Sequence, residues 1–234
     1  MIVCVSGGLD SLFAWYYLKK PKAIYFKLGH KYQRKELLSL QRIREVDPTF
    51  QPIIEDTGFR LSRFEYGETA YIPHRNLLIA LLASFHDSEI CIAGVKGDRV
   101  EDKSPLAFRI MSNCLNRIQK PHEKKIKISS PFWKWTKSQI LRWFIRQYGK
   151  EFAYRIVRAS ISCYDPHLLG QCGKCPSCLR KAIAMELNGL PLDIFHSDIR
   201  EWDGIEGYIE RLGEYDPVRR SEMIKAFKRW GWTV

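Results

Sequence analysis

A glycine pair between an apolar strand and a helix constrains the fold of this chain more than any other feature. The apolar run at residues 2–5 is typical of a buried strand, and the sequence SGGLDS at residues 6–11 separates it from a helical run at 12–18. Two adjacent glycines allow a tight turn with exposed N–H groups, and the helix that follows directs its positive end at the same point. The segment therefore predicts a phosphate site between a strand and a helix.

The polar residues of this loop fit a nucleotide. The hydroxyls of Ser6 and Ser11 can donate hydrogen bonds to phosphate oxygens, and Asp10 can hold the Mg²⁺ that accompanies ATP. The lysine that ends a Walker A loop is absent, so this is not the usual loop for γ-phosphate transfer. The alternative is an ordinary turn in which Asp10 or Ser11 caps the helix. We predict that the nucleotide is bound by Ser6, Gly7, Gly8, Leu9, Asp10 and Ser11.

Strands and helices alternate along the first 150 residues. Expected strands lie at 2–5, 23–27, 50–55, 89–93 and 125–129, and expected helices at 11–20, 31–45, 76–85, 106–118 and 136–148. The last of these helices starts at a capping box formed by Thr136 and Gln139. This alternation predicts an α/β fold, an open and mainly parallel five-stranded sheet with helices on both faces. Ligands in such folds bind beyond the carboxyl ends of the strands.

Four cysteines in the last third of the chain are spaced for a metal ion. Cys163 precedes a short segment that contains Cys172, Cys175 and Cys178. Two overlapping Cys-x2-Cys steps let a turning backbone present three sulfurs to one ion, and Cys163 completes a tetrahedral site from across the loop. Such a saturated site is structural, with Zn²⁺ as the expected ion and an iron–sulfur cluster as the alternative.

These patterns divide the chain into three expected units. They are a nucleotide-binding α/β domain at 1–150, a four-cysteine zinc-binding helical segment at 151–189 and a helical C-terminal appendage at 190–234. Helical runs near 205–212 and 218–230 support the last assignment.

Charge and hydropathy limit the partners. Lys and Arg number 38 against 26 Asp and Glu, a net charge of +12, which favours anionic ligands without choosing between nucleotides and nucleic acid. No apolar stretch approaches the ~18 residues that span a bilayer, and Met1 leads directly into the first strand. We therefore expect a cytoplasmic protein with free thiols and no membrane partner.

The loop and the cysteine cluster together resemble those of the 7-cyano-7-deazaguanine synthases, which are PP-loop ATP pyrophosphatases with an adenine nucleotide α-hydrolase-like fold. The pattern Cys-x8-Cys-Gly-x-Cys-x-Ser-Cys, followed by Leu-Arg-Lys, is similar to the family's C-terminal cluster. The sequence YIPHRN at 71–76, the stretch at 130–140, and Gly29 with Glu36 resemble further family segments. The resemblance covers roughly residues 1–188 and leaves the tail without a counterpart.

The resemblance implies an ATP-dependent ligase that turns 7-carboxy-7-deazaguanine into its nitrile, 7-cyano-7-deazaguanine (preQ0). ATP would adenylate the carboxylate, ammonia would form an amide, and a second activation would give the nitrile, with release of AMP and pyrophosphate. ATP, Mg²⁺ and Zn²⁺ are the implied cofactors, and a homodimer is plausible by resemblance alone. The implied catalytic residues are Asp10, Ser11 and Arg75.

Substrate binding is expected at two segments. Arg75 can fork onto a phosphate or carboxylate, and Asn76 can pair with a base edge or cap the following helix. The segment at 94–104 stands where the family carries a Gly-x3-Glu-Asp substrate region, but it is shorter and lacks the family's Tyr-Pro pair. Asp98 and Asp102 take the place of the family's acids, or they belong to a solvated charge run. The expected substrate residues are Arg75, Asn76, Gly94, Asp98 and Asp102.

Three other functions remain open at the level of sequence. One is a PP-loop enzyme that amidates a related deazapurine acid or joins it to another amine. A second is a PP-loop tRNA-modifying enzyme, in which tail aromatics stack on RNA instead of packing in a core. A third is a zinc-bearing nucleic-acid-binding module, which would have no use for the glycine loop. The tail aromatics in question are Trp202, Tyr208, Tyr215, Trp230 and Trp232.

Overall fold

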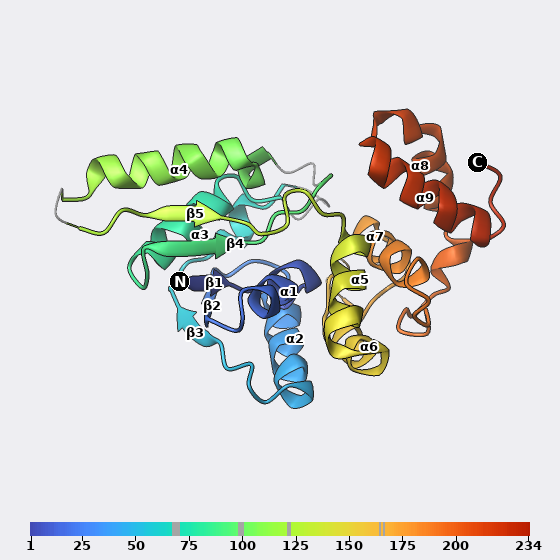
Figure 1. The fold of residues 1–234 in the computed structure, drawn as a ribbon, viewed down its shortest axis with the longest axis horizontal. Coiled ribbons are helices and arrows are strands. Elements are labelled where there is room, and N and C mark those ends of the chain that lie inside the picture. Colours follow the sequence, from blue (N-terminus) through green and yellow to red (C-terminus); the bar gives the residue numbers. More distant parts are fainter. Residues whose placement is uncertain (67–70, 98–100, 121–122, 164, 166) are drawn as a thin grey trace.

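Five parallel strands form one open sheet in the computed structural model (Figure 1). The model describes residues 1–66, 71–97, 101–120, 123–163, 165 and 167–234. The strand order is β3-β2-β1-β4-β5, with the first strand at the centre and every pair parallel. The strands are β1 (Ile2–Cys4), β2 (Lys22–Lys27), β3 (Ile53–Asp56), β4 (Glu89–Ile92) and β5 (Lys127–Ser129). The predicted parallel α/β fold is thereby confirmed.

Helices cover both faces because successive strand residues point to opposite sides. Val3 and Val5 pack into the core beneath one layer of helices, whereas Ile2 and Ile24 pack into the core beneath the other. The first layer contains α1 (Leu9–Tyr17), α2 (Gln33–Val46), α5 (Lys137–Tyr148) and α6 (Lys150–Ala159). The second contains α3 (Arg75–Ser84) and α4 (Pro105–Ile118).

The largest error in a predicted strand boundary has a local reason; the fifth strand also starts later than predicted, at Lys127 instead of residue 125. The third strand begins at Ile53 instead of residue 50. Phe50 is fully buried with its ring 5.0 Å from that of Trp15, and Pro52 has no N–H to donate to a neighbouring strand. Residues 50–52 therefore serve as packing and connection before the strand starts.

The C-terminal part forms a third core around α7 (Pro176–Glu186). Met223 and Phe227 of α9 (Pro217–Arg229) are buried against Leu179 and Ile183 of α7. The short helix α8 (Glu206–Glu210) lies beside α9 (Figure 1). The tail aromatics pack in this core rather than standing free, and they are Trp202, Tyr208, Tyr215, Trp230 and Trp232. The tail is thus folded onto α7, although its division from the preceding units at 150 and 189 stays a prediction.

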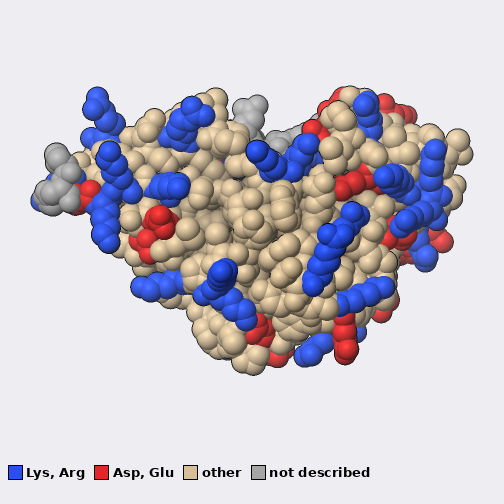
Figure 2. All heavy atoms as spheres, in the orientation of Figure 1, with Lys and Arg blue, Asp and Glu red and all other residues tan. Residues whose placement is uncertain are grey.

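Charge is spread over the face seen in Figure 2. Lys and Arg side chains extend from the α4 end to the α9 end, with acidic side chains among them. This face shows no single basic patch of the kind that a nucleic-acid groove requires. No helix in the described part of the chain has the length and apolar character needed to cross a membrane.

A buried carboxylate ties α1 to the end of α2. Asp47 accepts hydrogen bonds from Tyr16 Oη at 2.5 Å and from Lys20 Nζ at 3.0 Å. Burial opposes ionisation of this carboxyl group, but the hydrogen bonds from Thr49, Tyr16 and Lys20 outweigh it and lower the pKa of Asp47 to about 2. The ionised side chain therefore stabilises the folded state.

We expect Asp47→Asn to lower the free energy of unfolding by about 2 kcal/mol at pH 7. This stabilisation is complete above the unfolded-state pKa of 3.8 and is lost as the pH falls toward the folded-state pKa of about 2. The cost of the substitution should therefore shrink between about pH 4 and pH 2 in denaturant unfolding. Asp203→Asn, at an exposed carboxylate, provides the matched control variant. An equal cost for Asp47→Asn at both ends of the range would contradict the assignment.

Candidate active site

A cavity of about 250 Å³ lies at the carboxyl ends of three strands. Residues that follow β1, β2 and β4 line it, including Ser6, Leu28 and Ala93. The strand order reverses at β1, where β2 lies on one side and β4 on the other. Open parallel sheets bind ligands in the crevice at such a reversal. The cavity is therefore where the strand–helix rhythm predicts a ligand.

The glycine loop is shaped by contacts that exclude larger residues. Gly7 has a φ of +70°, and a Cβ atom on it would lie 2.7 Å from Cβ of Ser39 in α2. The hydroxyl of Ser11 accepts from the N–H of Ser6 and donates to the carbonyl of Gly8, both at 3.2 Å. The loop is thus held in its turn before any ligand binds.

The loop presents the start of α1 to the cavity. Gly8 is the N-cap residue and has no side chain to bond the first N–H groups, so the alternative of Asp10 or Ser11 as a helix cap is wrong. An N-terminus with no side-chain cap suits an anion. Leu9 is 1% exposed and packs in the core, so it can offer a ligand only its backbone.

Asp10 is paired with a lysine that the sequence reasoning did not place in the site. Lys137 Nζ lies 2.8 Å from the Asp10 carboxylate, and both side chains are mostly buried. Burial opposes ionisation of Asp10, but the Lys137 ammonium outweighs it and holds the pKa of the carboxyl below its usual range. The capping box of Thr136 and Gln139 is confirmed and fixes the start of α5, where Lys137 is the first residue. Asp10 is thus ionised, and a carboxylate oxygen is the kind of group that Mg²⁺ prefers as a ligand.

A further part of the cavity lining comes from α3. Arg75, its first residue, and Asn76 both line the cavity. The helix cap expected of Asn76 was wrong, because His74 is the N-cap residue, with a φ of 59°. Asn76 is instead 4% exposed and donates through Nδ2 to Asp102 Oδ1 at 2.8 Å. Two predicted substrate residues therefore bind each other.

The segment after β4 carries the remaining predicted substrate residues. Gly94 exchanges hydrogen bonds with the Ser130 hydroxyl, at 3.0 Å from its N–H and 2.6 Å to its carbonyl. A Cβ atom on Gly94 would lie 2.9 Å from the Lys103 carbonyl, so this glycine permits close packing and does not line the cavity. Asp98 lies outside the described residues. Lys103, which follows Asp102, does line the cavity.

Several polar residues line the cavity that the sequence analysis did not assign to it. For three of them a signal existed: Lys137 belongs to the capping-box sequence, Arg180 belongs to the Leu-Arg-Lys run after the last cysteine, and Glu36, with Gly29, resembles a family segment. For the others only the tertiary fold brings them to the cavity. The unassigned polar residues of the cavity wall are Tyr25, His30, Tyr32, Lys35, Glu36, Lys103, Lys137, Ser162, Ser177 and Arg180.

The four cysteines meet beside this cavity. The sulfurs of Cys163, Cys172, Cys175 and Cys178 all lie within 4.8 Å of one another, and Cys163 also lines the cavity. Backbone N–H groups donate to three of the sulfurs at 3.2 to 3.4 Å. Such bonds stabilise thiolate charge, which metal ligation requires. The cluster therefore forms a metal-binding site suited to zinc.

A buried lysine fits a charged metal centre. Lys181 is 1% exposed, and its Nζ donates to the carbonyl of Ser160 at 2.7 Å and to its hydroxyl at 2.9 Å. No carboxylate in the described part of the chain pairs with Lys181, and burial lowers the pKa of its amino group to about 7, because a buried cation without a counter-charge is costly. Four thiolates on one Zn²⁺ leave a net charge of −2, which supplies the missing anion. The residues present therefore fit a metal bound by four thiolates.

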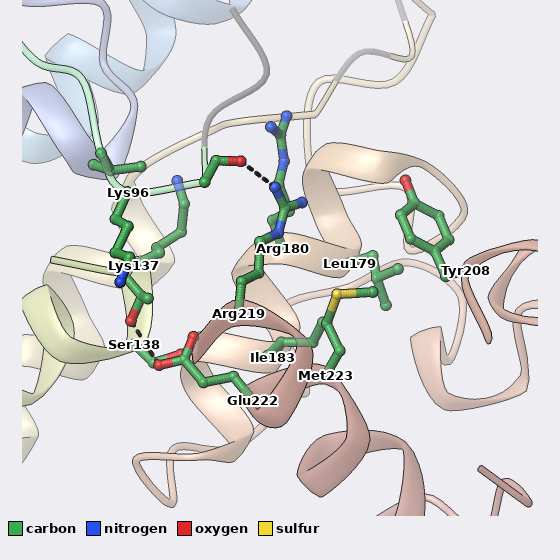
Figure 3. A pocket seen from close by; sticks show the side chains of 13 residues that line it. Lys96, Lys137, Ser138, Leu179, Arg180, Ile183, Tyr208, Arg219, Glu222 and Met223 are labelled. Atoms are coloured by element: carbon green, nitrogen blue, oxygen red, sulfur yellow. Dashed lines mark hydrogen bonds between the residues drawn. The ribbon is translucent and has the colours of Figure 1, made fainter. Parts of the chain in front are cut away.

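Residues of the tail line a smaller second cavity (Figure 3). Lys137 and Arg180 line both cavities, so they form part of the wall between them. From α9, Arg219 donates to the carbonyl of Gly97, and Glu222 accepts from Thr136 Oγ1 at 2.6 Å. The tail thus contacts both Gly97, in the segment after β4, and Thr136, the N-cap residue of α5.

The fold and the cavity define an α/β protein with a PP-loop. A family model described as queuosine biosynthesis protein QueC matches residues 62–189, more than half of the chain. The chain belongs to this family, as its motifs predicted. The match ends where the tail begins.

Relatives with an assigned activity extend over most of the chain. The 7-cyano-7-deazaguanine synthase of Methanococcus vannielii is 25% identical over 222 residues, covering 81% of this chain and 95% of its own. The synthase of Rickettsia conorii is 24% identical over 223 residues, with the same two coverages. That of Methanocaldococcus jannaschii is 23% identical over 225 residues, again covering 81% and 95%.

We expect the purified, reduced protein to carry about one zinc ion per chain, and Cys178→Ser to lose it. Loss of the ion should also lower the midpoint of thermal unfolding, because metal binding to such a site contributes to folding. Elemental analysis and a thermal melt provide the two readouts. Cys114→Ser alters an exposed thiol on α4 and should change neither. Stoichiometric zinc in Cys178→Ser, or none in the reduced parent protein, would contradict the assignment.

Proposed function

We propose that this protein is an AMP-forming ligase that converts 7-carboxy-7-deazaguanine into 7-cyano-7-deazaguanine with ATP and ammonia. Membership of the QueC family and the named activity of the relatives support this proposal. The observation that carries it is one cavity lined by both an anion-binding loop without a Walker lysine and a forked cation, Arg75. Such a cavity can hold the phosphates of ATP beside a carboxylate.

The first step activates a poor electrophile. An oxygen of the substrate carboxylate attacks the α-phosphorus of ATP, pyrophosphate leaves, and a mixed anhydride with AMP forms. In this proposal the N–H groups of Gly7 and Gly8 and the Ser6 hydroxyl stabilise the charge that develops on pyrophosphate, while the Ser11 hydroxyl, bonded to Ser6 and Gly8, holds the loop that presents them. Arg75 orients the carboxylate by a bidentate contact.

The second half repeats this chemistry on an amide. Ammonia attacks the acyl carbon, AMP departs with one oxygen of the former carboxylate, and a proton is released. The amide oxygen then attacks the α-phosphorus of a second ATP, and loss of AMP and a proton leaves the carbon–nitrogen triple bond. The same loop serves both activations, since each expels pyrophosphate.

Asp10 and the four cysteines take the roles of metal ligands in this proposal. Asp10 would hold Mg²⁺, which neutralises charge on the phosphates when bound. Lys137, 2.8 Å from Asp10, places a second positive charge at the same point. Cys163, Cys172, Cys175 and Cys178 would hold a structural Zn²⁺ that fixes one wall of the cavity.

We expect AMP and pyrophosphate to form only when 7-carboxy-7-deazaguanine, ammonia and ATP are all present, with two AMP for each nitrile. Chromatography of the nucleotides and mass spectrometry of the base measure both, because acid, amide and nitrile differ in mass. In the variant Asp10→Asn, which removes the charge of the proposed Mg²⁺ ligand, turnover should fall by about 100-fold or more. A product that stops at the amide would support the amidating alternative instead. AMP formation with tRNA but not with the deazapurine would contradict the proposal.

A further inference from the structure

A half-buried carboxylate lines the same cavity at the exit of β2. Glu36 lies in the first turn of α2, and its Oε2 is 3.1 Å from His30 Nε2. The N–H of Tyr32 donates to His30 Nδ1 at 3.2 Å, so the ring proton is on Nε2 and is donated to Glu36. The side chains of His30 and Glu36 are 3% and 20% exposed, respectively. His30 therefore fixes the orientation of a carboxylate that faces the cavity.

A phenol lies beside this carboxylate. Tyr25 is 3% exposed and lines the cavity, and its hydroxyl has no hydrogen bond of ordinary geometry in the described part of the chain, although the Glu36 carboxylate is close to it. Burial, together with the neighbouring Glu36 carboxylate, raises the pKa of Tyr25, so the phenol keeps its proton at neutral pH. A buried O–H group without a well-formed hydrogen bond next to a cavity can donate to a ligand that enters the cavity.

The pair offers a defined pattern to a ligand. Tyr25 supplies one donor, and Glu36 supplies two acceptor oxygens. A guanine-type ring presents the complementary edge, with the O6 acceptor followed by the N1–H and 2-amino donors. Adenine presents a ring-nitrogen acceptor where this ring has N1–H, and a carboxylate would repel it. The chemistry of the pair therefore selects a deazaguanine over the adenine of ATP.

We propose that Glu36, oriented by His30, binds the N1–H and 2-amino edge of the deazaguanine while Tyr25 donates to its O6. The assignment rests on the proposed function for the identity of the substrate. Arg75 lies in the same cavity and takes the carboxylate of that ring. Glu36 and Tyr25 thus determine which base is bound, and the glycine loop binds the ATP phosphates for activation of its carboxylate.

Substitution of Glu36 by its isosteric amide tests the base contact. We expect Glu36→Gln to raise KM for 7-carboxy-7-deazaguanine by about 10- to 100-fold, while KM for ATP changes by less than about 2-fold. An amide offers one acceptor and one donor, so it cannot accept from both groups of the base. Glu45→Gln, on the exposed side of the same helix, should change neither constant.

A substrate analogue gives a matched readout from the ligand. The parent protein should bind the deazapurine acid without its 2-amino group at least about 10-fold more weakly than the full substrate, whereas Glu36→Gln should scarcely distinguish the two. Tyr25→Phe removes only the phenol oxygen and should weaken binding of the full substrate by about 5- to 10-fold. This second variant keeps the test valid if Glu36→Gln does not fold.

The outcomes separate this inference from the proposed function. Calorimetry with the nitrile base alone measures base binding without turnover. Binding that depends on Glu36 in a protein that does not convert the acid would leave the inference standing and remove the proposed function. A Glu36→Gln variant with a raised KM for ATP and an unchanged KM for the acid would assign the pair to adenine and overturn the inference. Unchanged constants for both would overturn it as well.

Discussion

One buried hydroxyl, that of Ser39, joins the three parts of the chain that build the site. Ser39 is 0% exposed, and its Oγ donates to the Gly7 carbonyl at 2.6 Å and accepts from the N–H of Ile161 at 2.9 Å. Gly7 belongs to the nucleotide loop, Ser39 to α2, and Ile161 to the segment that leads to Cys163. Because Gly7 leaves no room for a side chain against Ser39, the loop, the helix and the cysteine segment take up their positions together.

Paired charges maintain this arrangement where water is largely excluded. Lys137 compensates Asp10 at 2.8 Å, and Lys181 places an ammonium beside a cluster that becomes anionic when its thiolates bind a metal. Arg180 and Lys137 also face the cavity under the tail. Glu222 of the tail, through Thr136, holds the start of the helix that carries Lys137. The tail lies outside the matched family segment, yet it contacts the residue next to a lysine of the site.

The sequence identified the parts of the site whose chemistry is local. Three patterns depend on residues within a few positions of one another: the glycine loop, the cysteine spacing and the Thr136 capping box. They can therefore be recognised from the sequence without knowledge of the fold. Lys137 pairs with Asp10 across 127 positions, and Asn76 with Asp102 across 26. Such partners follow only from strand order and helix packing. His74 as an N-cap with positive φ was equally beyond prediction, since histidine is not among the preferred cap residues.

The same distinction between local and long-range patterns explains why only part of the substrate site was predicted from the sequence. Arg75 was predicted because a forked cation before a helix is informative by itself. The cavity brings together Tyr25, His30 and Glu36, because Tyr25 lies near the carboxyl end of β2 and α2 begins shortly after that strand. Their joint hydrogen-bonding pattern exists only in three dimensions. Family membership then connects this cavity to a reaction on a deazapurine acid.

The central claim, that the cavity joins a carboxylate to the α-phosphorus of ATP, is tested most directly by oxygen transfer. The substrate is prepared with ¹⁸O in both carboxylate positions, and AMP, pyrophosphate and base are analysed by mass spectrometry after turnover. The account predicts one ¹⁸O in each AMP, none in pyrophosphate and a nitrile free of carboxylate oxygen. Unlabelled AMP, or label recovered in pyrophosphate or inorganic phosphate, would contradict it.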